Sequence, residues 1–414
     1  MRVKWRKYGT YSCSDVLGEH SNPPQTRWNQ RRSSLPALPF QISRRSLRVS
    51  LALGILGAVL ITVGGGCEGV PLEGGNPLVL SPDEAVPVPT TTRRAVPSPP
   101  VTAVPTTFHA AETAATLGGC KVFPADHFMN ATNIGALSVR AESTAWLNSI
   151  GGASATMVGP SSSIWQGSRP GTPMNIVDSR ATGFKPIIFG HDWSAKSYLG
   201  PYPLPSAPLL QGAPNPAGAW DKRAMVVDSA ECIAYELIQY KQLWIGTSFI
   251  RVALAGTRYP LNSNEMPVGT TNAPNTPLIG MYLLNSEVKS GSIPHVMAFC
   301  SQNTRISTAS MWPARKSDGF NTAADAMPMG TWVRLGSGAD PESFSGGARV
   351  VVEALQTRGA ILTDSCAHQF SLLAENSADW NNADMAQLSR LTPADFEVVD
   401  SSTMKVSDTS YAVR

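Results

Sequence analysis

An uncharged apolar run, residues 49–66, constrains this 414-residue chain more than any other feature. It follows directly after Arg44, Arg45 and Arg48. Its length lies between that of a signal-peptide core and that of a short membrane span. Because lysine and arginine mark the cytoplasmic side of such segments, the residues that follow are expected outside the cytoplasm. A buried core helix is the alternative, and the charged flank disfavours it.

Cys67 ends the apolar run and leaves three export routes open. It follows three glycines, where bacterial lipoprotein signals place the cysteine that is lipidated, although Gly64 stands where that signal normally carries leucine. A plain signal peptide and an uncleaved anchor are the alternatives. Residues 43–47 also resemble a twin-arginine export signal. Every route places the rest of the chain outside the cell or on the outer face of the cytoplasmic membrane.

The charge of the chain changes sign after the leader. Residues 1–48 hold ten basic and two acidic residues, which leaves 23 basic and 28 acidic residues in 49–414. A mildly acidic body lacks the basic face that supplies most nucleic-acid affinity, so nucleic acid is excluded as a partner.

Composition divides the chain into three parts. We interpret residues 1–67 as a basic leader with the export signal, 68–119 as a disordered Pro/Thr-rich tether and 120–414 as a globular extracellular domain. Proline fixes φ and removes an amide donor, so the tether is expected to be extended at roughly 3 Å per residue. The third part is long enough for one large core and shows no second linker.

Apolar patterns in the third part predict a mainly β or α+β fold, an antiparallel β-sandwich-like single domain with a few helices. Helices are expected at 141–150, 347–358 and 385–391. Strands are expected at 186–189, 224–228, 232–237, 247–253, 295–299, 331–335, 360–363 and 369–373.

Seven short blocks of this domain resemble a family of secreted bacterial proteins without an established activity, common in actinobacteria. The blocks are FPAD at 123–126, GPYPLP at 200–205, VVD at 226–228 with YEL at 235–237, WPAR at 312–315, MPMG at 327–330, RGAILTD at 358–364 and FEVVD at 396–400. The sequence departs from the pattern at Lys316, where the family usually has histidine, and at Ser365 and Cys366, where it usually has Asn-Gly. The resemblance implies export and a shared fold, and it leaves the chemistry open.

Four cysteines remain after the leader and Cys67. An even number in an exported domain predicts two disulfides, and the three possible pairings stay open; four buried thiols are the alternative. No Cys or His spacing is typical of a metal site, so no metal or cofactor is expected. The cysteines are Cys120, Cys232, Cys300 and Cys366.

No nucleophile or phosphate-binding motif is present in the sequence, which leaves carboxylates as the candidate catalytic groups. Glycoside hydrolysis needs two carboxyl groups roughly 5–10 Å apart. In the expected hairpin, a three-residue loop puts Asp228 and Glu236 on one face but about 13 Å apart, and a two-residue loop puts them on opposite faces. At most one of the two is therefore catalytic.

A second candidate site consists of polar residues at the ends of expected strands. We predict that His295, Arg315 and Asp364 lie in one cleft together with Asp228 or Trp312, since strand ends gather on one rim when strands are adjacent. A structural cap or ion pair is the alternative for these groups. His191 and Asp192 are expected to be poor partners for each other, because neighbours on an extended chain point to opposite sides.

These observations favour a glycan-active hydrolase of the cell envelope over a non-catalytic polysaccharide- or protein-binding envelope protein. Asp364 or Asp228 would supply the catalytic carboxylate, with His295 and Arg315. Trp193, Tyr202 and Trp312 would form a platform for sugar rings. The expected partner is extracellular or cell-wall polysaccharide, with membrane contact through the N-terminal segment only, and the protein is expected to be a monomer.

Overall fold

The computed structural model describes residues 115–414, apart from 166, 215–220 and 268. The basic leader, the apolar run, Cys67 and residues 68–114 of the tether lie outside the described residues. Within the described part of the chain, no helix is long and apolar enough to cross a membrane.

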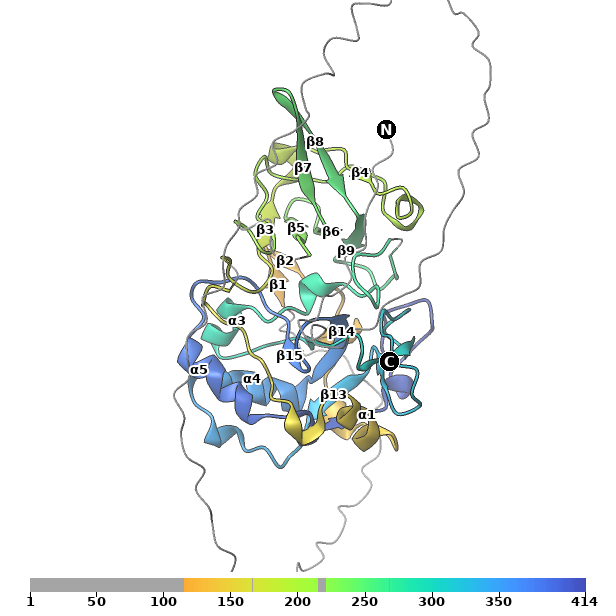
Figure 1. The fold of residues 1–414 in the computed structure, drawn as a ribbon, viewed down its shortest axis with the longest axis vertical. Helices are drawn as coiled ribbons and strands as arrows, with labels where there is room; N and C mark the ends of the chain where they lie inside the picture. Colours follow the sequence, from red (N-terminus) through yellow and green to blue (C-terminus); the bar gives the residue numbers. More distant parts are fainter. Residues whose placement is uncertain (1–114, 166, 215–220, 268) are drawn as a thin grey trace, which may run out of the picture. The chain divides into compact units, whose positions relative to one another are not determined.

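A mixed five-stranded sheet lies in the C-terminal half of the described chain (Figure 1). Its central pair, β10 and β14, is parallel, and the other pairs are antiparallel. In sheet order the strands are β15 (Ser371–Leu372), β10 (Met297–Ser301), β14 (Ala360–Ser365), β13 (Trp332–Leu335) and β16 (Phe396–Val398).

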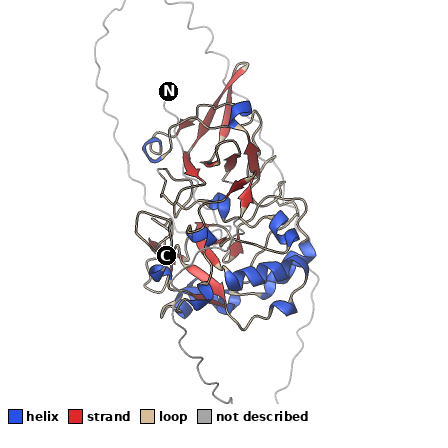
Figure 2. Ribbon diagram, turned by 180° about the vertical axis from the view of Figure 1, so that it is seen from behind, coloured by secondary structure: helices blue, strands red, loops and turns tan. Residues whose placement is uncertain are grey.

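Most of the helical turns lie beside this sheet (Figure 2). The longest helix buries Val351, Val352 and Leu355, whose spacing places them on one face. Gly359, with φ of 70°, follows the helix and lets the chain turn directly into β14. The α-helices are α1 (Ser143–Ser149), α2 (Ser179–Thr182), α3 (Asn285–Ser290), α4 (Gly346–Thr357) and α5 (Asn382–Ala386).

Two further sheets are built mainly from residues 174–260. Their strands pair in the orders β3-β5-β6-β9 and β4-β8-β7, and two short pairs, β1-β2 and β11-β12, complete the described strands. The strands are β1 (Thr116–Leu117), β2 (Cys120–Lys121), β3 (Met174–Val177), β4 (Ile188–Phe189), β5 (Ala224–Asp228), β6 (Ile233–Ile238), β7 (Lys241–Ile245), β8 (Ser248–Ala253), β9 (Ala255–Pro260), β11 (Ile306–Ser310) and β12 (Met327–Met329).

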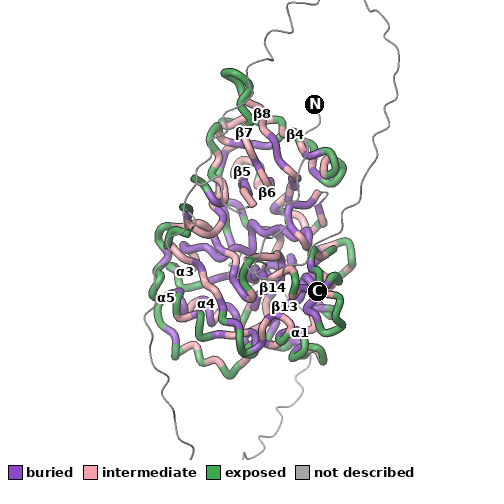
Figure 3. The backbone as a smooth tube through the Cα atoms, viewed as in Figure 1, coloured by how far each residue is buried: buried purple, intermediate pink, exposed green. Residues whose placement is uncertain are grey.

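The strands of these sheets contain many of the buried residues. Every residue of β5 and of β10 is buried, as expected for central strands with short apolar runs. Buried residues run through the five-stranded sheet and through the sheets built from residues 174–260, whereas the far end of the β7–β8 hairpin is exposed (Figure 3).

The mainly β class with a few helices is confirmed, and so are strands over most of the expected segments. The expectation of antiparallel sheets is wrong in part, because β10–β14, β3–β5, β4–β8 and β11–β12 are parallel pairs. The sandwich arrangement stays a prediction. The β5–β6 turn has neither expected length: Asp228 is opposite Ile233 and Glu236 is opposite Met225, so the two carboxylates lie on opposite faces of the sheet.

Two disulfides are present, as predicted, and the structure selects one of the three pairings. Cys120 pairs with Cys232, and Cys300 pairs with Cys366. The bridges join residues 112 and 66 positions apart, so each closes a long loop. Structural disulfides of this kind are typical of proteins that fold in an oxidising compartment.

Peptide mapping of the unreduced protein is expected to recover only the 120–232 and 300–366 links. Replacing Cys120 and Cys232 together by serine should lower the free energy of unfolding by roughly 2–5 kcal/mol, because the unfolded chain regains the entropy of an open loop. Urea unfolding measures the change, with Cys67→Ser as the control outside the described residues. Crossed links or four alkylatable thiols would contradict the pairing.

Candidate active site

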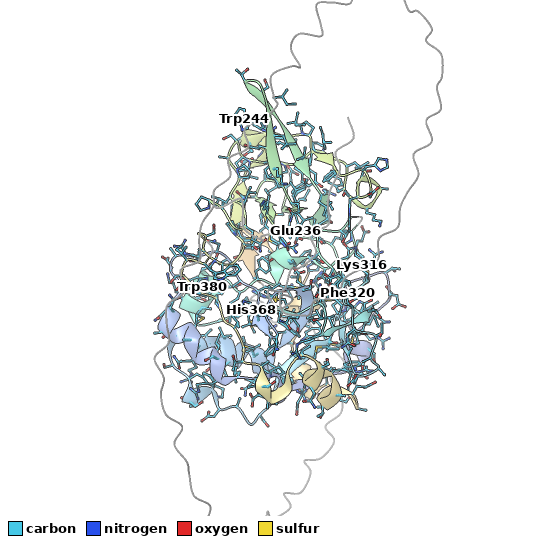
Figure 4. The ribbon with its side chains drawn as sticks, in the orientation of Figure 1. Glu236, Trp244, Lys316, Phe320, His368 and Trp380 are labelled. Carbon is cyan, nitrogen blue, oxygen red and sulfur yellow. A yellow bond between two sulfur atoms is a disulfide. The ribbon has the colours of Figure 1, made fainter. Side chains whose placement is uncertain are left out.

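A cavity of about 300 Å³ lies where the segment before β5 and the loops after β9 and β11 meet the end of β14. This is the lower end of the size range of small-molecule sites. Figure 4 labels Lys316, which lines the cavity, and Glu236, a residue of strand β6. The lining residues are Trp193, Asp221, Arg223, Ile238, Leu254, Ala255, Thr270, Thr271, Asn272, Ala273, Lys316, Ser317, Asp318, Asp364 and Ser365.

The guanidinium of Arg223 connects the two sides of this cavity. Its Nη2 donates to Asp364 Oδ2 at 2.7 Å and to Asp221 Oδ2 at 2.9 Å, and its Nη1 donates to the carbonyl of Thr271 at 2.7 Å. The Arg223 side chain is only 3% exposed, whereas Asp221 is 44% exposed. Two carboxyl groups from distant parts of the sequence are thus held at a single nitrogen.

Local backbone features place these side chains. Lys222, between Asp221 and Arg223, has φ of 51°, an uncommon conformation that a non-glycine residue adopts when its surroundings fix it. On the other side, the register of β10 against β14 shifts so that Cys300 is opposite Asp364, which leaves Thr363 as an extra residue. Such bulges re-aim the side chains next to them.

The Cys300–Cys366 bridge fixes the end of β14 directly beyond this bulge. The amide of Cys366 donates to the carbonyl of Ser301 at 2.9 Å. Ser365 Oγ donates to Asp318 Oδ2 at 2.7 Å, so the same strand end also positions a third carboxylate of the cavity. The position of Asp364 therefore depends on a disulfide and a bulge as well as on the strand itself.

Charge and burial together raise the pKa of Asp364 to about 7. Burial is the largest cause, Arg223 opposes it, and the carboxylates of Asp221 and Asp318 add to it. The described lining holds three carboxylates against two cations, Arg223 and Lys316. A single bound proton removes the excess negative charge, and Asp364 is the most buried of the three carboxyl groups.

The two cations respond in opposite directions. Burial alone would lower the pKa of Arg223, but the carboxylates of Asp364 and Asp221 raise it, so the guanidinium stays charged. The pKa of Lys316 is lowered, first by burial and then by the nearby charges of Lys196 and Arg315. Asp318 opposes that shift.

A second buried carboxylate lies behind the cavity wall. Glu236 Oε2 accepts from Thr271 Oγ1 at 2.7 Å, and its Oε1 accepts from the amide of Ile279 at 3.1 Å. Burial raises the pKa of Glu236, and Arg223 counteracts this. Because Thr271 also accepts from Arg223, Glu236 supports the position of the guanidinium from behind.

The predicted cleft with His295, Arg315 and Asp364 is wrong. His295 precedes β10, whereas Asp364 ends the parallel strand β14, so the two lie at opposite ends of this pair. At roughly 3.3 Å per residue the offset of five residues is about 16 Å. His295 is buried, and its Nε2 contacts Glu287 Oε2 at 3.0 Å while its Nδ1 contacts the carbonyl of Val296 at 2.9 Å.

The other residues of that prediction also lie outside the cavity lining. Arg315 immediately precedes Lys316, but its Nη1 donates to the carbonyl of Pro267 at 3.3 Å. The Trp312 indole donates to the carbonyl of Ser410 at 3.0 Å and packs against Phe128. Neither residue lines the cavity.

Asp228 lies at the end of β5 away from Arg223. Its side chain is fully buried, and Oδ1 accepts from the amides of Ser179 and Ala230, both at 3.1 Å. This is the structural role of a cap at a strand end and a helix start, and Asp228 does not line the cavity.

The three aromatic residues expected to stack on sugar rings lie in different environments. Tyr202 is fully buried among other rings, and its hydroxyl donates to the carbonyl of Tyr198, so the prediction that it stacks on sugar is wrong. Trp193 lines the cavity, beside the ammonium of Lys196. The same loop turns sharply, which brings His191 Nδ1 to 3.1 Å from Asp192 Oδ1, contrary to the expectation for an extended chain.

The residues that sequence reasoning missed are Asp221, Arg223 and Asp318. Asp221 and Arg223 directly precede an expected strand, where charged residues usually face solvent. The available signal was a basic residue two positions after an acid, directly before a strand that begins with four apolar residues. Its partner, Asp364, is 141 positions away, and only the fold brings the two together.

Comparison with protein-family models, curated proteins and solved structures finds no match to this chain. The resemblance to secreted actinobacterial proteins therefore stays a prediction. Across the residues that the structure describes, no group of three or more His, Cys, Asp or Glu side chains is arranged to hold a metal ion.

The raised pKa of Asp364 makes a prediction about stability. The carboxyl group of Asp364 keeps its proton up to about pH 7 in the folded state but loses it near pH 4 in the unfolded chain. The free energy of unfolding of the wild type therefore falls as the pH rises between these values. The free energy of unfolding of Asp364→Asn, relative to wild type, should therefore increase from pH 4 to pH 8, by on the order of 2–4 kcal/mol.

Denaturant unfolding of the full chain at intervals of pH measures this difference. Asp325→Asn, an exposed carboxylate outside the cavity lining, is the matched control and should show no such trend. A pH-independent difference for Asp364→Asn would contradict the protonated carboxyl.

Proposed function

We propose that this chain is an exported glycoside hydrolase of the cell envelope, and that Asp364 and Asp221 are its catalytic carboxyl groups. The observation that carries the proposal is the contact of both groups with Arg223 Nη2, at 2.7 and 2.9 Å. Carboxyl groups joined through one nitrogen are no more than about 6 Å apart, close to the roughly 5–5.5 Å of retaining glycosidases.

The two environments suit two different roles. Asp364, buried and with a pKa of about 7, holds a proton at neutral pH and acts as the general acid toward the glycosidic oxygen. Asp221 is nearly half exposed at the cavity and acts as the nucleophile. Water then releases the sugar, with Asp364 as the base, so the anomeric configuration is retained.

The cavity also limits the class of substrate. Its volume of about 300 Å³ admits one or two sugar rings, and Trp193 supplies an apolar face on which a ring stacks. When Asp364 is protonated, the two remaining carboxylates of the lining balance its two cations. No excess positive charge is then left to bind the carboxylate of a uronic acid. We therefore expect a neutral extracellular or cell-wall polysaccharide as substrate.

Export is supported by observations independent of the cavity. Both disulfides fit an oxidising compartment. The basic leader followed by an uncharged run fits a segment that delivers the domain outside, whether it is cleaved, lipidated at Cys67 or retained. Two of the departures from the family pattern, Lys316 and Ser365, line the cavity, which fits a site adapted to a substrate of its own.

A non-catalytic polysaccharide-binding protein is the second candidate. The observation that favours it is the buried position of Arg223, since ion pairs that only stabilise a fold also shift pKa values in this way. In that case the cavity would bind sugar with the carboxylates fixed in their ion pairs.

The test incubates the full chain with a panel of neutral bacterial and plant polysaccharides. We expect new reducing ends, no unsaturated products, and first-formed sugars of retained configuration by NMR. Asp364→Asn and Asp221→Asn should each lower kcat by roughly 10²–10⁴-fold, because general acid–base and nucleophilic groups contribute on this scale. The rate should also fall above about pH 7 as Asp364 loses its proton.

Asp325→Asn is the control and should retain the wild-type rate. Unsaturated products, or an undiminished rate in Asp364→Asn, would overturn the proposed mechanism. Saturable sugar binding without any cleavage would establish the second candidate.

A further inference from the structure

The β7–β8 hairpin exposes more apolar surface than its place in the fold explains. Leu243, Trp244 and Ile245 are 38%, 65% and 62% exposed. These residues end β7, and Gly246, with φ of 63°, makes the turn into β8. The hairpin extends away from the neighbouring strands (Figure 1).

The apolar side chains occupy both faces of the hairpin. Leu243 pairs with Ile250 and Trp244 pairs with Phe249, and successive residues of a strand point to opposite sides. The rings of Trp244 and Phe249 lie 5.0 Å apart on one face, while Leu243, Ile245 and Ile250 share the other. A surface that docks against a protein or a sugar needs only one such face.

The charged residues of the hairpin itself have one sign. Between Glu236 and Glu265 the sequence has no acidic residue. Lys241 and Arg251 lie at the base of the apolar tip, where Arg251 also covers the Phe249 ring at 4.7 Å. At roughly 3.3 Å per residue, the tip reaches about 10–13 Å beyond this basic level.

We propose that the β7–β8 hairpin inserts into the interface of an anionic lipid bilayer, with Trp244 and Ile245 among the acyl chains and Arg251 and Lys241 at the headgroups. A bilayer interface surrounds the tip and covers both apolar faces at once, which neither a second copy on one face nor a sugar platform does. Tryptophan is enriched at this depth, and apolar faces enter it by roughly 5–10 Å. Basic side chains add attraction to anionic lipids.

This contact would orient the candidate active site. The amide of Gly190 donates to the carbonyl of Ala253 at the end of β8, and the loop that follows carries Trp193 into the cavity. A docked hairpin would therefore hold the cavity at a set height above the bilayer. The inference depends on the proposed export only in that a membrane must be within reach, and it makes no use of the cavity chemistry.

The test reconstitutes the full chain into vesicles of phosphatidylglycerol and phosphatidylcholine whose acyl chains carry bromine, which quenches tryptophan fluorescence on contact. We expect the quenched fraction to fall in Trp244→Phe, because the inserted indole has been removed. Trp165→Phe, which removes a tryptophan that is 53% exposed elsewhere, is the matched control and should leave the quenched fraction unchanged. Arg251→Glu should reduce quenching in anionic vesicles.

Equal quenching in Trp244→Phe, Trp165→Phe and wild type would overturn the inference. So would cross-linking between copies that depends on Trp244, or a change in Trp244 fluorescence caused by oligosaccharide alone. Cleavage of a soluble polysaccharide by the same samples should be unaffected by Trp244→Phe. A failure of insertion is thereby distinguished from a failure of the proposed activity.

Discussion

The contact of one buried guanidinium with two carboxyl groups connects the parts of this domain that matter for function. Arg223 precedes β5, an inner strand of one sheet, and Asp364 lies near the end of β14, the central strand of another. A buried ion pair contributes little net stability, but removal of one partner leaves an uncompensated charge, which typically costs about 3–5 kcal/mol. The surrounding structure, including the β14 bulge and the Cys300–Cys366 bridge, must therefore hold Arg223 and Asp364 at contact distance.

Local structure was largely readable from the sequence. Residues 224–228 and 360–363 are short apolar runs that could hardly be exposed, and the spacing in 347–358 followed by Gly359 predicts a helix and its end. Segments such as β9, with glycine and proline at its ends, gave no strand pattern. Strand direction was not readable at all, and the parallel pairing of β10 with β14 separates His295 from Asp364.

The candidate site was predictable only in part. The sequence indicates Asp364 and Trp193 as candidate site residues, because they lie at strand and loop ends. The pattern around Arg223 and Asp221 is that of ordinary solvated charges before a strand. Their role depends on contacts between residues more than a hundred positions apart, which no local pattern encodes. Tyr202 and Trp244 show the same limit for aromatic residues, since the first is fully buried and the second is mostly exposed.

The central claim is that Asp364 keeps its proton up to about pH 7, because burial and two further carboxylates outweigh the guanidinium. The most direct measurement is a ¹³C NMR titration of the aspartate carboxyl carbons, with Asp364 assigned by the signal that disappears in Asp364→Asn. The account predicts a main transition near pH 7 for this carbon. A transition near pH 4, the ordinary value of an aspartate, would contradict it.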